Sequence, residues 1–197
     1  MSVRLIAALL LIIGALAAVG FARREGRIHE QDRLANIASD LAGRPVAVHC
    51  PGFLASLVRV RTEGGYVKFD ADGRPADSTE LSPETCKALR HLDRADFSCI
   101  ERGDCTYKQF KLAWAPHTLA HESFHLRGFA AEAMAECYAL QNTAYVAERL
   151  GVEHTIALRV QKWVYLKGYP NEPEDYRSGD CTDGGRLDLH PQSSDWP

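Results

Sequence analysis

The chain lacks the features that define several large classes of protein. It has no cluster of basic residues interleaved with aromatic residues, and its formal net charge is only −3, so we expect no nucleic acid as a partner. It has no internal repeat and no low-complexity stretch. Its six cysteines include no CxxC pair, which disfavours a cysteine-based metal site. The 197 residues, 46% of them hydrophobic, are sufficient for one domain with a real core.

The cysteines that are present indicate disulfide bonds. An even number of cysteines without metal-binding spacing is typical of proteins in an oxidising compartment. The six are Cys50, Cys86, Cys99, Cys105, Cys137 and Cys181. Because Cys99 and Cys105 enclose only five residues, we expect a bridge between them. Cys137 is expected either to pair with one of the other three or to remain a buried free thiol.

An uncharged run from Leu5 to Ala22 occupies the N-terminus. Its eighteen residues suit either a membrane-spanning helix or the core of a signal peptide, and Ala15-Leu16-Ala17 could be a cleavage site. We therefore expect residues 1–24 to be a membrane anchor or a signal peptide and residues 25–197 to be the domain.

Two opposing signals bear on the location of that domain. Arg23, Arg24 and Arg27 follow the uncharged run and would, by the positive-inside rule, hold that side in the cytoplasm. The cysteines favour export, and we give them more weight. The expectation is a single-pass protein of the cell membrane with its domain on the extracytoplasmic side, or a secreted protein if the segment is cleaved.

Beyond the hydrophobic N-terminal helix, the sequence predicts an α+β domain that is mainly helical and has a small N-terminal β-sheet or hairpin. Helices are predicted over 29–41, 83–92, 107–114, 130–150 and 155–166. A strand is predicted over 46–50, and a hairpin with strands 56–61 and 66–70. The tail after residue 166 is polar, but Tyr176, Cys181 and Trp196 indicate that it is pinned to the domain, across the cleft.

The most informative residues are His121 to His125, which spell HESFH, an instance of the HExxH pattern. Residues four apart lie on one face of a helix, so His121 and His125 can point two imidazoles at one cation. Glu122 can then take a proton from a water bound to that cation. Pro116 suits the first turn of a helix and Gly128 its left-handed cap, which predicts a short helix that ends just past His125.

A catalytic zinc site needs a third protein ligand, and we expect it on the next helix. A tight turn after Gly128 makes the two helices antiparallel, so Glu132 should face His125. Glu136, one turn further along, should face His121 and hydrogen-bond its imidazole. Alternatively, Glu132 and Glu136 form a solvated helix face.

Residues 118–137 resemble the zincin superfamily of metallopeptidases, in particular the gluzincins, in which a glutamate on a later helix is the third ligand. The resemblance implies that His121, His125 and Glu132 bind Zn²⁺ and that Glu122 is the general base. The gap between His125 and Glu132 is shorter than in familiar gluzincins. The stretch HESFHLRGFAAE is also similar to the HExxHxxGxxH arrangement of metzincins, but the only methionines are Met1 and Met134, so no downstream methionine turn can form.

The function that this pattern predicts is zinc-dependent hydrolysis of a peptide or protein substrate. An exposed edge strand at Tyr66 to Phe69 could pair with an extended substrate, or the hairpin could merely cover the core. The residues considered as donors to the oxyanion are His117, Tyr138, His154, Tyr176 and His190, with Tyr176 and His190 first. The alternative function is an exported, disulfide-stapled domain that binds a partner at the cell envelope, with structural zinc or none.

Overall fold

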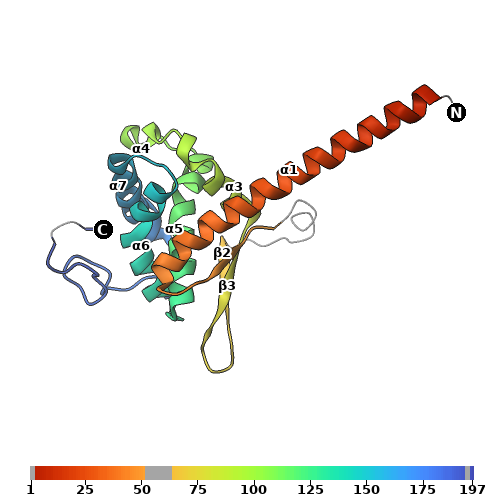
Figure 1. Cartoon of the computed structure of the whole chain (residues 1–197). Helices are drawn as coiled ribbons and strands as arrows, with labels where there is room; N and C mark the ends of the chain where they lie inside the picture. Colours follow the sequence, from red (N-terminus) through yellow and green to blue (C-terminus); the bar gives the residue numbers. More distant parts are fainter. Residues whose placement is uncertain (1–2, 52–63, 194–195) are drawn as a thin grey trace.

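The protein, described by a computed structural model over residues 3–51, 64–193 and 196–197, has an α+β fold that is mainly helical. Helix α1 (Val3–Ala42) runs without interruption through the boundary predicted between residues 24 and 25. Its last turns lie in the body of the protein, where Leu34 and Ile37 are buried, and the remainder extends away from the body (Figure 1). Within the described residues, no helix has both the length and the apolar character needed to cross a membrane.

A small sheet of three strands, in the described part of the chain, lies against the helices in the order β1-β3-β2. Strand β3 (Pro75–Leu81) pairs in parallel with β1 (Ala47–His49) and antiparallel with β2 (Gly65–Phe69). The sequence predicts β1 and β2, but β3 was missed because PADSTEL contains few apolar residues and no apolar alternation. The predicted strand 56–61 lies outside the described residues.

The remaining helices include the predicted ones in their predicted order, together with short helices that were not predicted. They are α3 (Pro83–Arg90), η1 (Leu92–Arg94), α4 (Ser98–Arg102), α5 (Tyr107–Arg127), α6 (Glu132–Arg149) and α7 (His154–Trp163), and then the short turns η2 (Val164–Gly168), η3 (Tyr169–Asn171) and η4 (Glu174–Tyr176). The expected end signals are used: the Ser82 side chain accepts a hydrogen bond from the Thr85 N–H at the start of α3, and Gly151, with φ of 94°, follows α6.

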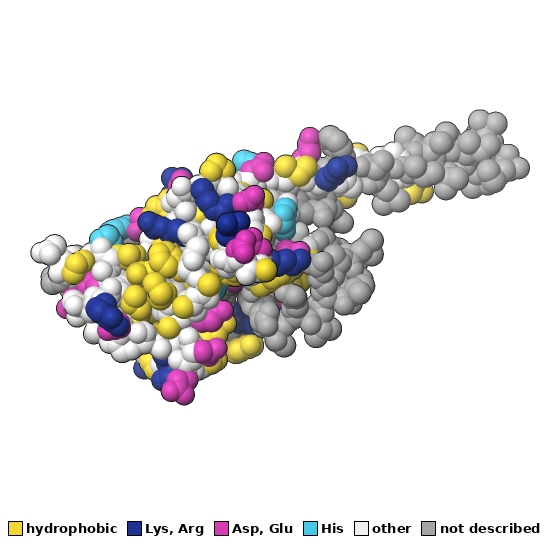
Figure 2. All heavy atoms as spheres, turned by 90° about the horizontal axis from the view of Figure 1, so that it is seen from below, with side chains coloured by type: hydrophobic (Ala, Val, Ile, Leu, Met, Phe, Trp, Pro, Cys, Tyr) yellow, Lys and Arg dark blue, Asp and Glu magenta, His cyan; other side chains and the backbone are white. Residues whose placement is uncertain are grey.

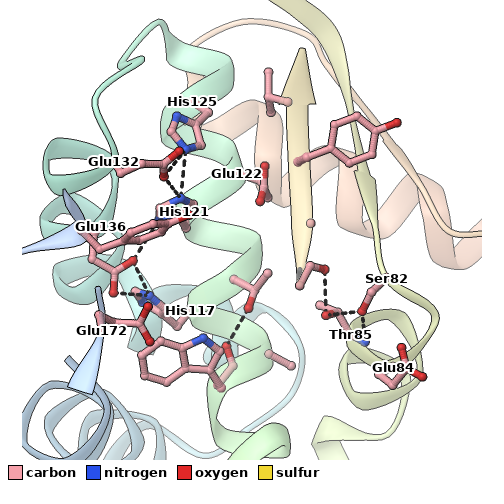
Figure 3. A pocket seen from close by; sticks show the side chains of 18 of the residues that line it. Ser82, Glu84, Thr85, His117, His121, Glu122, His125, Glu132, Glu136 and Glu172 are labelled. Atoms are coloured by element: carbon pink, nitrogen blue, oxygen red, sulfur yellow. Dashed lines mark hydrogen bonds and ion pairs between the residues drawn. The ribbon is translucent and has the colours of Figure 1, made fainter. Parts of the chain in front are cut away.

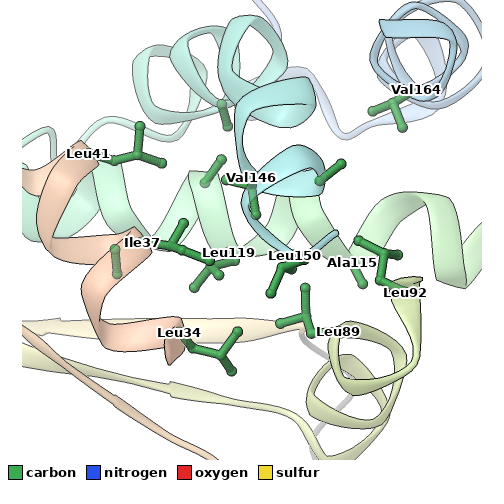
Figure 4. Packing of buried hydrophobic residues seen from close by; sticks show 14 of the residues in the cluster. Leu34, Ile37, Leu41, Leu89, Leu92, Ala115, Leu119, Val146, Leu150 and Val164 are labelled. Atoms are coloured by element: carbon green, nitrogen blue, oxygen red, sulfur yellow. The ribbon is translucent and has the colours of Figure 1, made fainter. Parts of the chain in front are cut away.

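The hydrophobic core lies between the C-terminal part of α1, the sheet and helices α3, α5 and α6. Figure 4 shows side chains from these helices meeting there: Leu34 and Ile37 of α1, Leu89 of α3, Leu119 of α5 and Val146 of α6. All five are at most 3% exposed. Burial of apolar area on this scale is the main stabilising term, and it holds α5 rigidly in the centre of the domain.

Three disulfide bonds use all six cysteines. Cys99 pairs with Cys105, as predicted, Cys50 pairs with Cys86, and Cys137 pairs with Cys181. The last bond ties α6 to the C-terminal segment, which we define as residues 164–197. On the face of the body seen in Figure 2, Lys and Arg side chains are interspersed with Asp and Glu around an area of hydrophobic side chains.

Candidate metal centre

Helix α5 carries the HESFH motif and is longer than the sequence predicted. It starts at Tyr107 with a capping box, in which the Thr106 side chain accepts a hydrogen bond from the Gln109 N–H and the Gln109 side chain accepts one from the Thr106 N–H. Pro116 therefore lies inside the helix, and the prediction of a separate short motif helix that begins near Pro116 is wrong. The capping box supplies a stronger start signal than the proline.

The end of α5 places the second histidine of the motif in the last turn of the helix. Gly128, with φ of 114°, is the C-cap, as the sequence predicted, and its N–H donates to the carbonyls of His125 and Phe124. The Phe129 N–H also donates to the Phe124 carbonyl. This closed end turns the chain directly into α6, whose first residue is Glu132.

Three ligand-type atoms meet between α5 and α6. His121 Nε2 lies 2.9 Å from His125 Nε2 and 3.0 Å from Glu132 Oε2, and His125 Nε2 lies 3.1 Å from the same Glu132 oxygen (Figure 3). Zinc bonds to nitrogen and oxygen are about 2.0–2.2 Å long, so ligand atoms around tetrahedral zinc lie about 3.3 Å apart. The observed triangle fits such an ion with little adjustment.

The Nδ1 atom of each imidazole also has a hydrogen-bond partner. His121 Nδ1 lies 2.9 Å from Glu136 Oε2, and His125 Nδ1 donates to the Phe129 carbonyl over 2.7 Å. Carboxylates and carbonyls only accept, so both Nδ1 atoms carry hydrogen, and the Nε2 atoms are the ones available to a cation. Glu136 thus lies where the antiparallel register predicts, against His121.

The carboxylates and imidazoles of this cluster shift one another's pKa values. Burial alone would lower the pKa of His121, but hydrogen bonds with Glu132 and Glu136 outweigh it and raise the pKa to about 10. Hydrogen bonds with His121 and His125 lower the pKa of Glu132. Burial alone would raise the pKa of Glu136, but the charges and hydrogen bonds of the neighbouring histidines lower it. The two carboxylates therefore stabilise a positive charge on or beside His121. When no metal ion is bound, a second proton on the His121 ring supplies that charge.

Glu122 points away from α6, toward the sheet (Figure 3). It is 4% exposed, and burial raises its pKa to about 7. Its Oε2 lies 3.4 Å from the Thr79 hydroxyl of β3. Strand β2 passes closely over it, since a Cβ atom added to Gly65 would lie 2.9 Å from both Cγ and Oε1 of Glu122. The Thr79 contact could not be predicted, because β3 itself was missed.

The motif opens into a cavity of about 970 Å³ between α5, the sheet, α3 and the C-terminal segment. Tyr176 of η4 lines this cavity, and its ring stacks on that of His121 with 5.7 Å between centroids. Burial raises the pKa of Tyr176, so its hydroxyl keeps its proton. From the C-terminal segment, Glu172, Pro173 and Tyr176 thus line the cavity.

The other donors considered for the oxyanion are placed differently. His190 and His154 are exposed and do not line the cavity, and Tyr138 packs against Phe124 and Phe129. His117 does line the cavity, but its Nε2 lies 3.0 Å from each carboxylate oxygen of Glu136. Of these candidates, only His117 and Tyr176 line the cavity. The Nε2 atom of His117 is hydrogen-bonded to a carboxylate, which leaves Tyr176 as the better candidate.

Two features of the site were not recognised in the sequence. The first is the buried pairing of His117 with Glu136, for which a signal exists, because His117, His121 and His125 recur every four residues on one face of α5. The second is Glu172, which lines the cavity beside Glu136 (Figure 3). It lies in an irregular segment where no sequence pattern indicates a position.

Comparison of the chain with models of known protein families, with curated proteins and with solved structures finds no match.

Proposed function

We propose that the protein is a zinc-dependent peptidase in which His121, His125 and Glu132 hold the ion and Glu122 is the general base. One observation carries the proposal: two Nε2 atoms and one carboxylate oxygen converge while both Nδ1–H groups are bound elsewhere. Zinc-binding histidines almost always donate their second N–H to a carboxylate or a carbonyl, because this fixes the tautomer and the ring orientation.

The composition of the site supports a catalytic ion over a structural one. Structural zinc is usually closed by four ligands and is rich in cysteine, whereas a catalytic site has three protein ligands and an open position. Here the donors are two histidines and one glutamate, and the three line the cavity together with Glu122. The alternative of an envelope-binding domain with structural zinc has no comparable feature in its favour.

The chain's own residues have distinct tasks in this reaction. Bound zinc would supply a Lewis acid and would lower the pKa of a coordinated water. Glu122 takes the proton of the attacking water and transfers it to the leaving nitrogen of the peptide bond. The Tyr176 hydroxyl, protonated and at the cavity wall, donates a hydrogen bond to the oxyanion. Strands β2 and β3 cover the side of Glu122 that faces away from α6 and shield it from water.

The three disulfides support a location in an oxidising compartment, because such bonds persist outside the reducing cytosol. We propose that the domain acts on the extracytoplasmic side of the cell membrane. Anchoring by residues 1–24 stays a prediction.

Metal analysis of the full oxidised chain and its variants tests the function. The wild-type protein should bind one zinc per chain and cleave members of a peptide library, read by mass spectrometry. Glu122→Gln should keep zinc and lose hydrolysis, since it removes the proton carrier but no ligand. Glu132→Ala should lose most of the zinc affinity, because it removes a ligand. His190→Ala, an exposed histidine outside the cavity, is the matched control.

Full zinc occupancy in both His121→Ala and His125→Ala would show that the ion binds elsewhere. Undiminished hydrolysis by Glu122→Gln would remove the general base from the mechanism. Zinc binding without hydrolysis of any peptide by the wild-type chain would favour the binding domain.

A further inference from the structure

His117 is the third histidine on the face of α5 that contacts α6. It is 1% exposed, and its Nε2 lies 3.0 Å from both Oε1 and Oε2 of Glu136. Glu136 is itself 2% exposed. Neither residue belongs to the proposed set of zinc ligands, yet both lie in a continuous chain of contacts that ends at His121 (Figure 3).

The hydrogens in this chain can be assigned. The Glu136 carboxylate faces two imidazole nitrogens, His117 Nε2 and His121 Nδ1, and a carboxylate only accepts hydrogen bonds. Both nitrogens therefore donate to it. With His121 Nδ1 committed as a donor, the nitrogen that remains for a metal ion is Nε2, the atom that faces His125 and Glu132.

His117 is held firmly on its other side. Its Nδ1 lies 3.3 Å from the hydroxyl of Thr143, about two helical turns beyond Glu136 on α6, and its ring centroid lies 4.6 Å from that of Trp114. A ring fixed in this way can fix the plane of the Glu136 carboxylate. Without His117, a buried carboxylate would keep a single donor, and its orientation against His121 would no longer be determined.

His117, His121 and Glu136 could also be read as a second metal site, since their ligand-type atoms lie within 4.8 Å of one another. One observation disfavours that reading. Occupation of both sites would require His121 to give up the hydrogens of both ring nitrogens, because Nδ1 faces Glu136 and Nε2 faces Glu132.

We propose that His117 is a positioning residue, which acts through Glu136 to fix the orientation and tautomer of the zinc-binding His121. This rests on the proposed function, because it assumes that His121 binds the ion. It adds to the site a third histidine that acts through Glu136 and not as a zinc ligand.

The experiment compares two amides at position 117 in the full oxidised chain. In His117→Gln the amide nitrogen reaches about as far as Nε2 and can still donate to Glu136, whereas in His117→Asn it reaches only about as far as Nδ1. Zinc affinity is measured by competition with a chelator, and ligand geometry by the visible absorption of the Co²⁺-substituted protein. Circular dichroism checks folding, and His190→Ala is the control.

We expect His117→Asn to lower zinc affinity by about 10- to 100-fold and to change the Co²⁺ spectrum, as removal of outer hydrogen-bond partners does in zinc sites. His117→Gln should restore most of both properties. Equal affinities and spectra for wild type, Gln and Asn would overturn the proposal while leaving the proposed function intact. Two Co²⁺ ions in the wild type and one in both variants would overturn it in favour of the second site. A wild-type chain that binds no metal would remove both proposals.

Discussion

His121 is the residue on which the centre depends, because each of its ring nitrogens faces a different carboxylate. Nε2 lies against Glu132 and Nδ1 against Glu136, at 3.0 and 2.9 Å. With no cation bound, these two neighbours hold the pKa of His121 at about 10, so the ring is doubly protonated at neutral pH. A metal ion must displace the Nε2 proton before it can bind.

Zinc binding should therefore release a proton at neutral pH. Because the pKa is raised, the competing proton is present throughout the range below about 10, so apparent zinc affinity should rise with pH up to about that value. Calorimetry at pH 7.5 in buffers of different ionisation enthalpy should give heats that differ between buffers, equivalent to about one proton per zinc. Heats that are the same in all buffers would contradict the protonated state of His121.

The sequence alone was enough to find the residues of the centre whose positions follow from helix periodicity. His121, His125 and Glu132 converge because spacings of four along α5 and a tight turn at Gly128 determine their geometry. The contact of Thr79 with Glu122 could not be found this way, because it joins residues 43 positions apart through a strand with no apolar alternation.

At the scale of elements, the sheet matters to the site through its close approach to α5. Strand β2 crosses the motif helix at Gly65, where the backbone lies against the Glu122 side chain and Leu81. A residue with any side chain would contact Glu122 at its Cγ atom, which cannot move aside as freely as a chain end. The absence of a side chain at position 65 thus leaves room for Glu122, the proposed general base.

Gly65→Ala should displace Glu122 and lower kcat by at least about 10-fold. Misplacement of a catalytic group by about 1 Å can lower the rate about 100-fold. Zinc content should not change, because no ligand lies within the predicted clash. Gly179→Ala is the matched control, since a Cβ there meets nothing within 4 Å. Kinetics together with zinc analysis measures both effects. Loss of zinc in Gly65→Ala would show instead that the strand supports the ligands.

The length of α5 shows what element-level prediction missed and why. Pro116 is a weak indicator of a helix start when a capping box formed by Thr106 and Gln109, which begins ten residues upstream, satisfies free N–H groups of the first turn. The ends of α3 and α6 were predicted well, because Ser82 and Gly151 act locally.

At the scale of the whole molecule, the C-terminal segment lines one part of the cavity and is fixed to the body at several points. Cys181 is bonded to Cys137 of α6, one residue beyond Glu136, and the Gln141 side chain holds the carbonyl of Leu187. The same segment carries Tyr176 to the cavity. The polar composition of this tail alone predicts disorder. The disulfide with Cys137 attaches the tail to the domain, but the sequence could not identify which cysteine pairs with Cys181.

Removal of the Cys137–Cys181 bond should separate metal binding from catalysis. The double variant Cys137→Ser/Cys181→Ser should keep zinc, lower kcat through loss of the Tyr176 position, and lose stability by about 2–5 kcal/mol. The control Cys99→Ser/Cys105→Ser opens a loop of only six positions and should keep kcat. Zinc analysis, kinetics and urea unfolding measure the three properties. Wild-type kcat in the first variant would show that the bond does not hold Tyr176 in place.

Pairs of residues that meet at the site are separated by different numbers of positions along the sequence, and these separations affect the order in which the contacts form during folding. His121 and Glu136 are 15 positions apart and His125 and Glu132 only 7, whereas Thr79 lies 43 positions from Glu122 and Cys181 lies 44 from Cys137. Short loops close at a smaller entropic cost than long ones, and local contacts form early. We therefore expect a newly made chain to bring its proposed zinc ligands together first, and to cover Glu122 and position Tyr176 last. Under the proposed function, such a chain would bind its metal ion before it could hydrolyse neighbouring chains.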